Sequence, residues 1–357
     1  MNTKPLANMK IMAQLPASSN EAAGGSNYEY EMEALAPLGV EGIGVIEANS
    51  AEEFLAQTHD ADALIVSWGI RITREVIEGL NNCKVISVGS VGVDMVDIAA
   101  ATAAGIVVTN TPDVFIEETA DHAMMLLLAA HRRTKMMDDM VRRGDWRKGR
   151  PVLARTTRLW GQTLGLLAFG NIATAVARRA KPFGLRVIAH DPYVSELKMT
   201  GEGVQPVSMA ELLAQSDFLS LHSPLNATTH HLMSDAQFAA MKNSAVLVNT
   251  SRGGVVDEAA LVRALQSGQI AAAGLDVLEY EPPAADHPLF AMDNVILTPH
   301  AASGTSRMRP ASRRRVGHEI ALVLSGRWPM SPVNPTVLPR VDLERWQPYP
   351  MGRGPNR

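Results

Sequence analysis

Hydrophobic and polar positions alternate along the chain in the pattern that is typical of parallel α/β proteins. Short aliphatic and β-branched runs are separated by amphipathic stretches with a helical period. In the first part of the chain the predicted strands are 9–15, 40–46, 63–66, 85–88 and 106–109. A second alternation predicts strands at 163–169, 186–189, 218–221, 245–249, 270–275 and 295–297. The pattern therefore predicts two parallel sheets covered by helices.

Capping residues mark several of the predicted helix starts. The spacing of a capping box occurs in Ser50 with Glu53, Ser208 with Glu211 and Ser234 with Gln237, and Asp257 is a plausible N-cap for 258–267. A long helix is predicted over 114–142 around an apolar centre at 123–130. The segment from 142 to 158 is basic and has no clear period, so no element is predicted there.

The last predicted helix, 306–325, decides the domain organisation. It follows the sixth strand of the second alternation, where a doubly wound sheet has no place for it, so we expect it to return to the first domain. The chain then forms two doubly wound, Rossmann- or flavodoxin-like α/β domains. The first is discontinuous, with residues 1–111 and 306–357, and the second spans 112–305. The proline-containing tail beyond Pro339 is predicted to be an extended arm.

Composition narrows the class of protein. The chain has 357 residues, 46% hydrophobic and 20% charged, with 33 Lys and Arg against 37 Asp and Glu. This balance argues against nucleic acid or an anionic membrane as partner. Cys83 is the only cysteine, which excludes a disulfide framework and a multi-cysteine metal cage. No apolar run approaches the roughly 20 residues that span a bilayer, and the N-terminus lacks a signal-peptide pattern. We expect a cytoplasmic protein that binds no metal.

A strand–turn–helix at 164–173 has the form of a dinucleotide-binding loop. Gly170 is kept at the place where the backbone must approach a pyrophosphate. The amides of Asn171 and Ile172 would face that group at a helix N-terminus. Ala168 stands where a glycine usually serves the tight turn, so its effect on cofactor affinity is left open.

Asp191 follows the next predicted strand, 21 residues beyond Gly170. A carboxylate at this place accepts hydrogen bonds from the ribose hydroxyls and repels a 2′-phosphate, which favours NAD over NADP. The same residue is equally well placed to cap the turn before Pro192. Both interpretations stand at this point.

Arg252, Glu281 and His300 each follow a predicted strand of the second domain, and ligands of such sheets bind at the carboxyl ends of the strands. An arginine holds a substrate carboxylate in a forked geometry, and a histidine supported by a carboxylate exchanges a hydroxyl proton. Hydride transfer at a 2-hydroxy acid needs these groups. Taken singly they are a loop cation, a surface charge and a satisfied histidine. Their joint placement favours the catalytic interpretation.

The chain resembles the D-isomer-specific 2-hydroxyacid dehydrogenase family, which includes glyoxylate and hydroxypyruvate reductases and phosphoglycerate dehydrogenases. The likeness covers about residues 60 to 335 and lies in 88–94, 108–112, 120–122, 221–225, 248–253, 274–282 and 298–300. It places the family's Arg–Glu–His set on Arg252, Glu281 and His300. It also implies NAD as cofactor and a small 2-keto or 2-hydroxy acid as substrate.

Further contacts are expected around this set. With the resemblance, cofactor contacts beyond the glycine loop are expected at Asp191, His222, Thr250, Ser251, Arg252, Asp276 and His300. The resemblance also implies substrate contacts at Arg252 and, through backbone amides of the first domain, at Val91 and Gly92. Trp68 either lines that pocket or packs in the core.

We therefore expect an NAD-dependent dehydrogenase of a small 2-hydroxy acid. The alternative is an NAD(H)-sensing binding protein of the C-terminal binding protein type, which shares the same motifs without metabolic turnover. The long helix 114–142 carries more apolar surface than one sheet face covers, which predicts a homodimer.

Other polar residues receive plainer interpretations. His122 lies on the apolar face of the long helix and is expected to be a core or interface histidine. His230 and His231 are adjacent and are not expected to face one metal together, so no ligand role is assigned to them. The arginine cluster 307–315 is either a solvated helix face or a receptor for a multiply anionic substrate.

Overall fold

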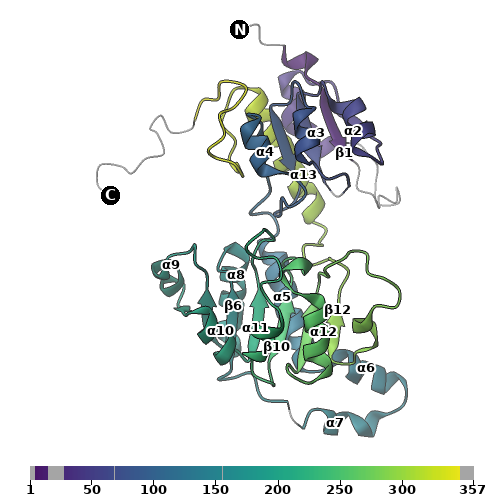
Figure 1. Ribbon diagram of the computed structural model, residues 1–357, viewed down its shortest axis with the longest axis vertical. Helices are drawn as coiled ribbons and strands as arrows, with labels where there is room; N and C mark the ends of the chain where they lie inside the picture. The colour runs from purple at the N-terminus through teal and green to yellow at the C-terminus, as the bar shows by residue number, and fades with distance from the viewer. Residues whose placement is uncertain (1–4, 15–27, 68, 155, 346–357) are drawn as a thin grey trace. The chain divides into compact units, whose positions relative to one another are not determined.

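The structure, a computed structural model, describes residues 5–14, 28–67, 69–154 and 156–345. The chain divides into two compact units (Figure 1). Unit 1 consists of Met1–Val114 and Ser306–Arg357, and unit 2 consists of Phe115–Thr305. Each unit is built on one parallel sheet, so the predicted fold class is confirmed. Within the described ranges, no helix has the length and apolar character needed to cross a membrane.

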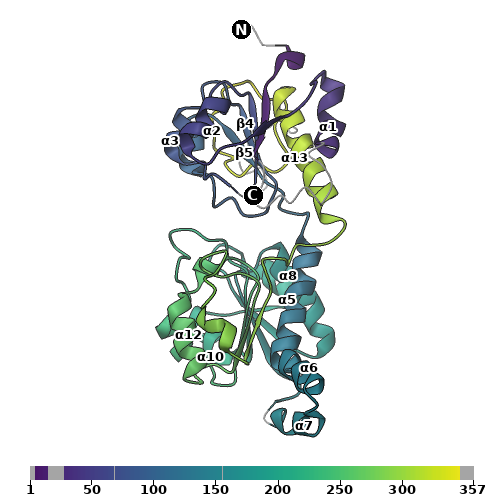
Figure 2. The same ribbon diagram turned by 90° about the vertical axis from the view of Figure 1, so that its right-hand side faces the viewer.

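Unit 1 has a five-stranded sheet in the order β2-β1-β3-β4-β5. Its strands are β1 Ile11–Gln14, β2 Gly44–Ile46, β3 Ala63–Val66, β4 Val85–Val88 and β5 Val107–Thr109. Its α-helices are α1 Glu29–Leu35, α2 Ala51–Thr58, α3 Arg74–Glu78, α4 Ile98–Ala103 and α13 Met308–Leu324, with 3₁₀ turns η1 Leu6–Asn8 and η3 Ala36–Leu38. Helices α1 and α13 cover one face of the sheet, and α2 and α3 cover the other (Figure 2).

Unit 2 has a seven-stranded sheet in the order β12-β11-β10-β9-β6-β7-β8. Its strands are β6 Thr163–Leu167, β7 Arg186–His190, β8 Gln205–Pro206, β9 Phe218–Leu221, β10 Val246–Asn249, β11 Ala272–Leu275 and β12 Val295–Leu297. Its α-helices are α5 Ile116–His131, α6 Thr134–Arg142, α7 Gly149–Val152, α8 Asn171–Ala180, α9 Glu196–Gly201, α10 Met209–Gln215, α11 Asp235–Ala239 and α12 Glu258–Gln266. Its 3₁₀ turns are η4 Trp146–Lys148, η5 Lys181–Phe183, η6 Gly253–Val255 and η7 Pro288–Ala291.

Two apolar layers sandwich the sheet of unit 2. Helices α5 and α8 pack on one face, and α10 and α12 pack on the other (Figure 2). The strands read as nearly continuous buried runs because both faces are covered. The strand order reverses at β6, since β7 and β8 continue on one side and β9 to β12 on the other. Ligands bind at a switch point of this kind in open α/β sheets, so a ligand is expected near the loops after β6 and β9.

The predicted long helix 114–142 is wrong as a single element. The structure has two helices, α5 and α6, separated at Arg132 and Arg133. Arg133 has φ 52°, a left-handed conformation that ends the regular hydrogen-bond ladder of α5. Apolar periodicity does not report such a break, because the residues on both sides of it remain helical. Strands β3, β4, β9 and β12 lie at the predicted residues, whereas the two-residue strand β8 was not predicted.

Three of the predicted N-caps are seen directly. The Ser208 side chain caps the Glu211 amide while the Glu211 side chain returns to the Ser208 amide, a complete capping box. Asp257 accepts a hydrogen bond from the Ala260 amide. At α2 the Ser50 hydroxyl caps the Glu53 amide, but the Glu53 carboxylate accepts from Asn49 instead of Ser50.

The chain beyond α13 packs on unit 1. Arg340 donates hydrogen bonds to the carbonyl oxygens of Leu80, Asn81, Cys83 and Ala104. The Arg345 guanidinium lies 4.0 Å from the Trp328 ring centroid. The first residues of the predicted arm are thus fixed against the domain. Residues 346–357, and Trp68, lie outside the described residues.

A close approach between α1 and α13 predicts a large effect of one methyl group. A Cβ at Gly317 would lie 2.6 Å from the Glu31 Cα and would overlap the Glu31 carbonyl oxygen, and backbone atoms cannot move aside locally. We expect Gly317→Ala to lower the free energy of unfolding by about 1–3 kcal/mol in urea titrations. Gly201→Ala is the control, since a Cβ there meets nothing within 4 Å. Equal midpoints for both variants would refute the close packing.

Candidate active site

The loop between β6 and α8 has the geometry of an anion-binding turn. Ala168 has φ 68°, the left-handed conformation that glycine adopts without strain. Gly170 is the N-cap of α8, and no side-chain cap is present on the first-turn amides of this helix. A Cβ at Gly170 would meet no atom within 4 Å. The exposed helix N-terminus and the open space beside it suit a pyrophosphate group.

Asp191 closes the same loop from the end of β7. Its Oδ2 accepts a hydrogen bond from the Phe169 amide at 2.8 Å, and its Oδ1 accepts one from the Tyr193 amide at 2.8 Å. The carboxylate therefore does cap the following turn, and it also ties β7 to the loop that contains Ala168. A contact between this fixed carboxylate and a ribose stays a prediction.

Buried polar atoms without a hydrogen-bond partner follow β9 and β10 at this edge of the sheet. Among the described residues these include the Nε2 of His222, the Oγ of Ser223 and the Oγ1 of Thr250. Burial lowers the pKa of His222 to about 4, so its ring is neutral at pH 7. Buried polar atoms are normally paired in folded proteins. The donor and acceptor set at this edge therefore fits a polar ligand such as a dinucleotide.

His300 and Glu281 form a close pair. The Nδ1 of His300 lies 2.7 Å from the Glu281 Oε2, and both side chains are about 30% exposed. The Glu281 Oε1 accepts a hydrogen bond from the Leu278 amide at 3.0 Å. Both ends of the carboxylate are thus held, and Glu281 fixes the orientation of the imidazole ring.

A buried carboxylate determines the loop on which His300 lies. Asp276 is 2% exposed, and its oxygens accept hydrogen bonds from the Thr298 hydroxyl (2.6 Å) and from the amides of Ala301 (2.8 Å) and Ala302 (2.9 Å). The His300 amide donates to the Asp276 carbonyl oxygen at 2.8 Å. Sequence reasoning gave Asp276 a cofactor contact and missed this role, because the partners are more than 20 residues away.

His122 joins this network from α5. Its Nε2 lies 2.9 Å from the Thr298 hydroxyl and 3.4 Å from the Asp276 Oδ1. This agrees with the interpretation of His122 as a satisfied internal histidine. Its position in an apolar helix does not indicate these partners, because they lie more than 150 residues later in the sequence.

Arg252 follows β10 on a loop that Asn249 organises. The Asn249 side chain donates to the Arg252 carbonyl oxygen (3.0 Å) and accepts from the Ser251 amide (3.0 Å). Gly253 then packs directly on Leu278, where a Cβ would overlap the Leu278 carbonyl group. Because the Leu278 amide also holds Glu281, the loops of Arg252 and Glu281 are in backbone contact.

The remaining predicted residues lie on other segments or beside Arg252. Asn171 and Ile172 form the first turn of α8, and Ser251 stands beside Arg252. Val91 and Gly92 lie in unit 1 on the loop after β4, where the Asn110 side chain donates to the Val91 carbonyl oxygen at 2.7 Å. Their substrate contact stays a prediction.

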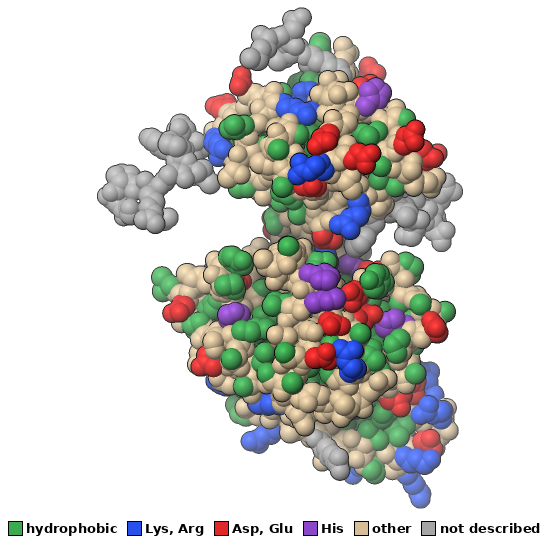
Figure 3. Space-filling view, in the orientation of Figure 1, with side chains coloured by type: hydrophobic (Ala, Val, Ile, Leu, Met, Phe, Trp, Pro, Cys, Tyr) green, Lys and Arg blue, Asp and Glu red, His purple; other side chains and the backbone are tan. Residues whose placement is uncertain are grey.

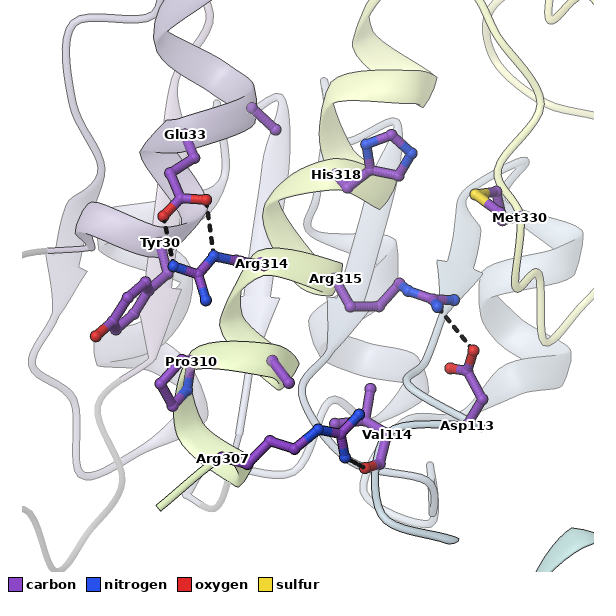
Figure 4. A pocket seen from close by; sticks show the side chains of 12 residues that line it. Tyr30, Glu33, Asp113, Val114, Arg307, Pro310, Arg314, Arg315, His318 and Met330 are labelled. Atoms are coloured by element: carbon purple, nitrogen blue, oxygen red, sulfur yellow. Dashed lines mark hydrogen bonds and ion pairs between the residues drawn. The ribbon is translucent and has the colours of Figure 1, made fainter. Parts of the chain in front are cut away.

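The arginine cluster serves the packing of α13 within unit 1. Arg314 forms a forked pair with Glu33 of α1 at 2.8 and 2.9 Å, and Arg315 lies 2.8 Å from Asp113 (Figure 4). Arg307 donates to the Val114 carbonyl oxygen at 3.2 Å. These groups line a surface cavity of about 940 Å³ next to α1 and α13. The cluster is thus largely matched by carboxylates of its own unit.

The sequence pattern described as "D-isomer specific 2-hydroxyacid dehydrogenase, NAD binding domain" matches residues 124–302. The chain is also 41% identical over 290 residues to the glyoxylate reductase of Korarchaeum cryptofilum, covering 81% of this chain and 87% of that protein. The chain belongs to the D-isomer-specific 2-hydroxyacid dehydrogenase family. The resemblance inferred from the motifs is confirmed.

Two further members of the family are similar to the chain in sequence or in structure. It is 40% identical over 314 residues to the D-3-phosphoglycerate dehydrogenase of Methanocaldococcus jannaschii, covering 87% of this chain but only 59% of that protein. The chain thus spans about three fifths of the length of this relative. The structure of an NADPH-dependent glyoxylate/hydroxypyruvate reductase from Sinorhizobium meliloti, in complex with NADP and malonate, superposes with a TM-score of 0.80 at 32% identity, covering 94% and 99% of the two chains.

The conformation of Ala168 leads to a stability prediction for the loop between β6 and α8. A left-handed alanine is strained relative to glycine, so we expect Ala168→Gly to raise the free energy of unfolding by about 0.5–1 kcal/mol. The control Ala173→Gly, within helix α8, should lower it by about 1 kcal/mol. Denaturant titration measures both. A loss of stability in Ala168→Gly similar to that of the control would contradict the assigned backbone conformation.

Proposed function

We propose that this protein is an NAD-dependent dehydrogenase that interconverts a small 2-keto acid and the corresponding 2-hydroxy acid. The His300–Glu281 pair, 2.7 Å apart and held on both sides, carries the proposal. The pair follows strands of the unit 2 sheet at their carboxyl ends. The open N-terminus of α8 follows β6 of the same sheet. Family membership supports the reaction class, and relatives named glyoxylate reductase support a small acid as substrate.

Each of the three polar groups has one task in the proposed reaction. In the reducing direction His300 donates a proton from Nε2 to the substrate carbonyl oxygen, and in the oxidising direction it accepts the proton back. Glu281 accepts a hydrogen bond from the Nδ1 of His300 and so orients the ring with its Nε2 available for proton exchange. Arg252 binds the substrate carboxylate with its forked donors. The nicotinamide of bound NAD(H) supplies or takes up the hydride.

Asp191 supports NAD as the preferred cofactor. Its carboxylate is fixed by two backbone amides at the end of β7. A fixed negative charge at this position accepts ribose hydroxyls and repels the 2′-phosphate of NADP. The preference is a property of this side chain and not of the fold, because a solved relative is NADPH-dependent. In this proposal unit 2 binds the cofactor, and the substrate contacts of Val91 and Gly92 stay predictions.

An activity screen with one active-site variant tests the proposal. We expect the purified protein to oxidise NADH faster than NADPH with at least one of glyoxylate, hydroxypyruvate or pyruvate. His300→Gln should lower kcat by about 100-fold or more because proton transfer is lost, while NADH affinity stays nearly unchanged. The control His59→Gln changes an exposed histidine at the C-cap of α2 in unit 1 and should leave kcat unchanged.

Failure of the screen has a defined meaning. NADH binding without turnover of any 2-keto acid would reject the dehydrogenase and favour the NAD(H)-sensing alternative. Full activity of His300→Gln would reject the assigned proton donor while leaving the enzyme class in place.

We also propose that the protein forms a homodimer through α5. Met125 of α5 and Phe183 are 40% and 44% exposed, and with Met124, Leu128 and Ala129 they line a mainly apolar groove of about 640 Å³. Trp146 and Trp160, on the segments after α6, are 76% and 67% exposed. Apolar side chains exposed in this number are typical of an interface between subunits.

Light scattering on the eluting protein tests this interface. We expect the wild type to elute at twice the chain mass of 38.4 kDa and Met125→Glu to shift toward the monomer, because an unpaired charge is costly in an apolar interface. Leu197→Glu, at an 81% exposed position on α9, is the matched control. A monomeric wild type, or equal behaviour of the two variants, would reject this interface.

A further inference from the structure

His230, His231 and Glu279 bring three ligand atoms within 4.8 Å of one another. No ligand role was expected for the adjacent histidines, but the backbone at His231 brings the two rings together. His231 has φ 52°, a left-handed conformation, and this brings its ring to the same side of the chain as that of His230. The two rings stack with centroids 3.9 Å apart and planes 24° from parallel.

Glu279 is held in the orientation that a ligand needs. Its Oε1 lies 2.7 Å from the Nε2 of His231, and its Oε2 accepts a hydrogen bond from the Glu258 amide at 3.3 Å. The Glu279 amide donates in return to the Glu258 Oε2 at 3.1 Å, and the Glu258 Oε1 lies 2.8 Å from the His287 Nε2. Partners of this kind, behind a ligand, fix its geometry and strengthen metal sites.

The cluster connects the loops that follow three neighbouring strands. The His231 amide donates to the Gly254 carbonyl oxygen at 2.9 Å, two residues beyond Arg252. Glu279 lies two residues before Glu281. Histidine and acidic side chains gather on this face of unit 2 (Figure 3). An ion bound here would cross-link the loop after β9 to the loop after β11, beside the proposed catalytic residues and not among them.

We propose that His230, His231 and Glu279 form a binding site for a divalent transition-metal ion of the zinc class. Two imidazole nitrogens and one carboxylate oxygen are a donor set that zinc accepts in sites that keep a fourth position open. Magnesium and calcium prefer oxygen ligands throughout and do not match this set. His230 is exposed and His231 is 36% exposed, so an ion reaches the site from solvent and keeps water at its fourth position.

Binding requires a local rearrangement of the two rings and the carboxylate. With ligand distances of about 2.0–2.1 Å and a tetrahedral angle, the His231 Nε2 and the Glu279 Oε1 would separate to roughly 3.3 Å. In the structure they are 2.7 Å apart and joined by a hydrogen bond. To bind an ion through Nε2, the His231 ring must carry its hydrogen on Nδ1, which is a change of tautomer. The stacked His230 ring has to tilt about its side-chain bonds to direct a nitrogen to the same ion.

Titration calorimetry with zinc chloride on the full chain, stripped of metal with a chelator, tests this site. We expect one zinc ion to bind per chain, and His230→Gln, His231→Gly and Glu279→Gln each to weaken binding about tenfold or more. Glycine tolerates the conformation of residue 231, and glutamine at 279 keeps an acceptor for the Glu258 amide, so these variants should fold. His59→Gln, in unit 1, should bind zinc like the wild type.

Two further measurements make the result decisive. Cobalt(II) in place of zinc should give the visible absorption of a tetrahedral site in the wild type but not in His231→Gly. Magnesium chloride should not compete for zinc. Absence of saturable zinc binding, equal affinity in the three variants and wild type, or loss of binding in His300→Gln alone would overturn the site. None of these readouts uses catalytic turnover, so the outcome is independent of the proposed dehydrogenase activity.

Discussion

The proposed active site depends on the hydrogen bonds that the buried carboxylate of Asp276 accepts. A buried carboxylate must be matched by hydrogen-bond donors, because an unpaired charge in the interior is very costly. The donors that match it are the Thr298 hydroxyl and two amides of the turn that follows His300. The requirement to satisfy one charge therefore fixes the loop and, with it, the direction of the imidazole. Glu281 needs only to complete an orientation that the backbone has already set.

Strained backbone is concentrated at the same edge of unit 2. Ala168, His231 and His300 are non-glycine residues with positive φ, and each lies on a loop that follows a strand of the central sheet. Conformations of this kind persist only where surrounding contacts over-determine them, and they are frequent at functional sites. Ala168 forms the turn before α8, His300 presents a ring to Glu281, and His231 stacks on its neighbour. In the proposals above, Ala168 belongs to the cofactor loop, His300 is the proton donor and His231 is a metal ligand.

Histidine–carboxylate pairs recur along one stretch of the chain with different consequences. Glu258, Glu279 and Glu281 each hold a histidine nitrogen at 2.7 or 2.8 Å. Glu258 and Glu279 also exchange backbone hydrogen bonds, which links the start of α12 to the loop after β11. The loops that present Arg252 and Glu281 are thereby connected at two points, the second being the packing of Gly253 on Leu278.

The sequence by itself determined the layered α/β architecture, most strand positions, the helix caps and the family, since these depend on local periodicity and short motifs. It also singled out Glu281 and His300, whose pairing the structure then displays. Only the tertiary structure decided the break at Arg133, the role of Asp276 and the convergence of His231 with Glu279, which are 48 residues apart. A residue pattern records which side chains are buried along one element. It does not record a single left-handed dihedral angle or the distant donor that satisfies a buried charge, because both are set by the packing of elements far apart in the chain.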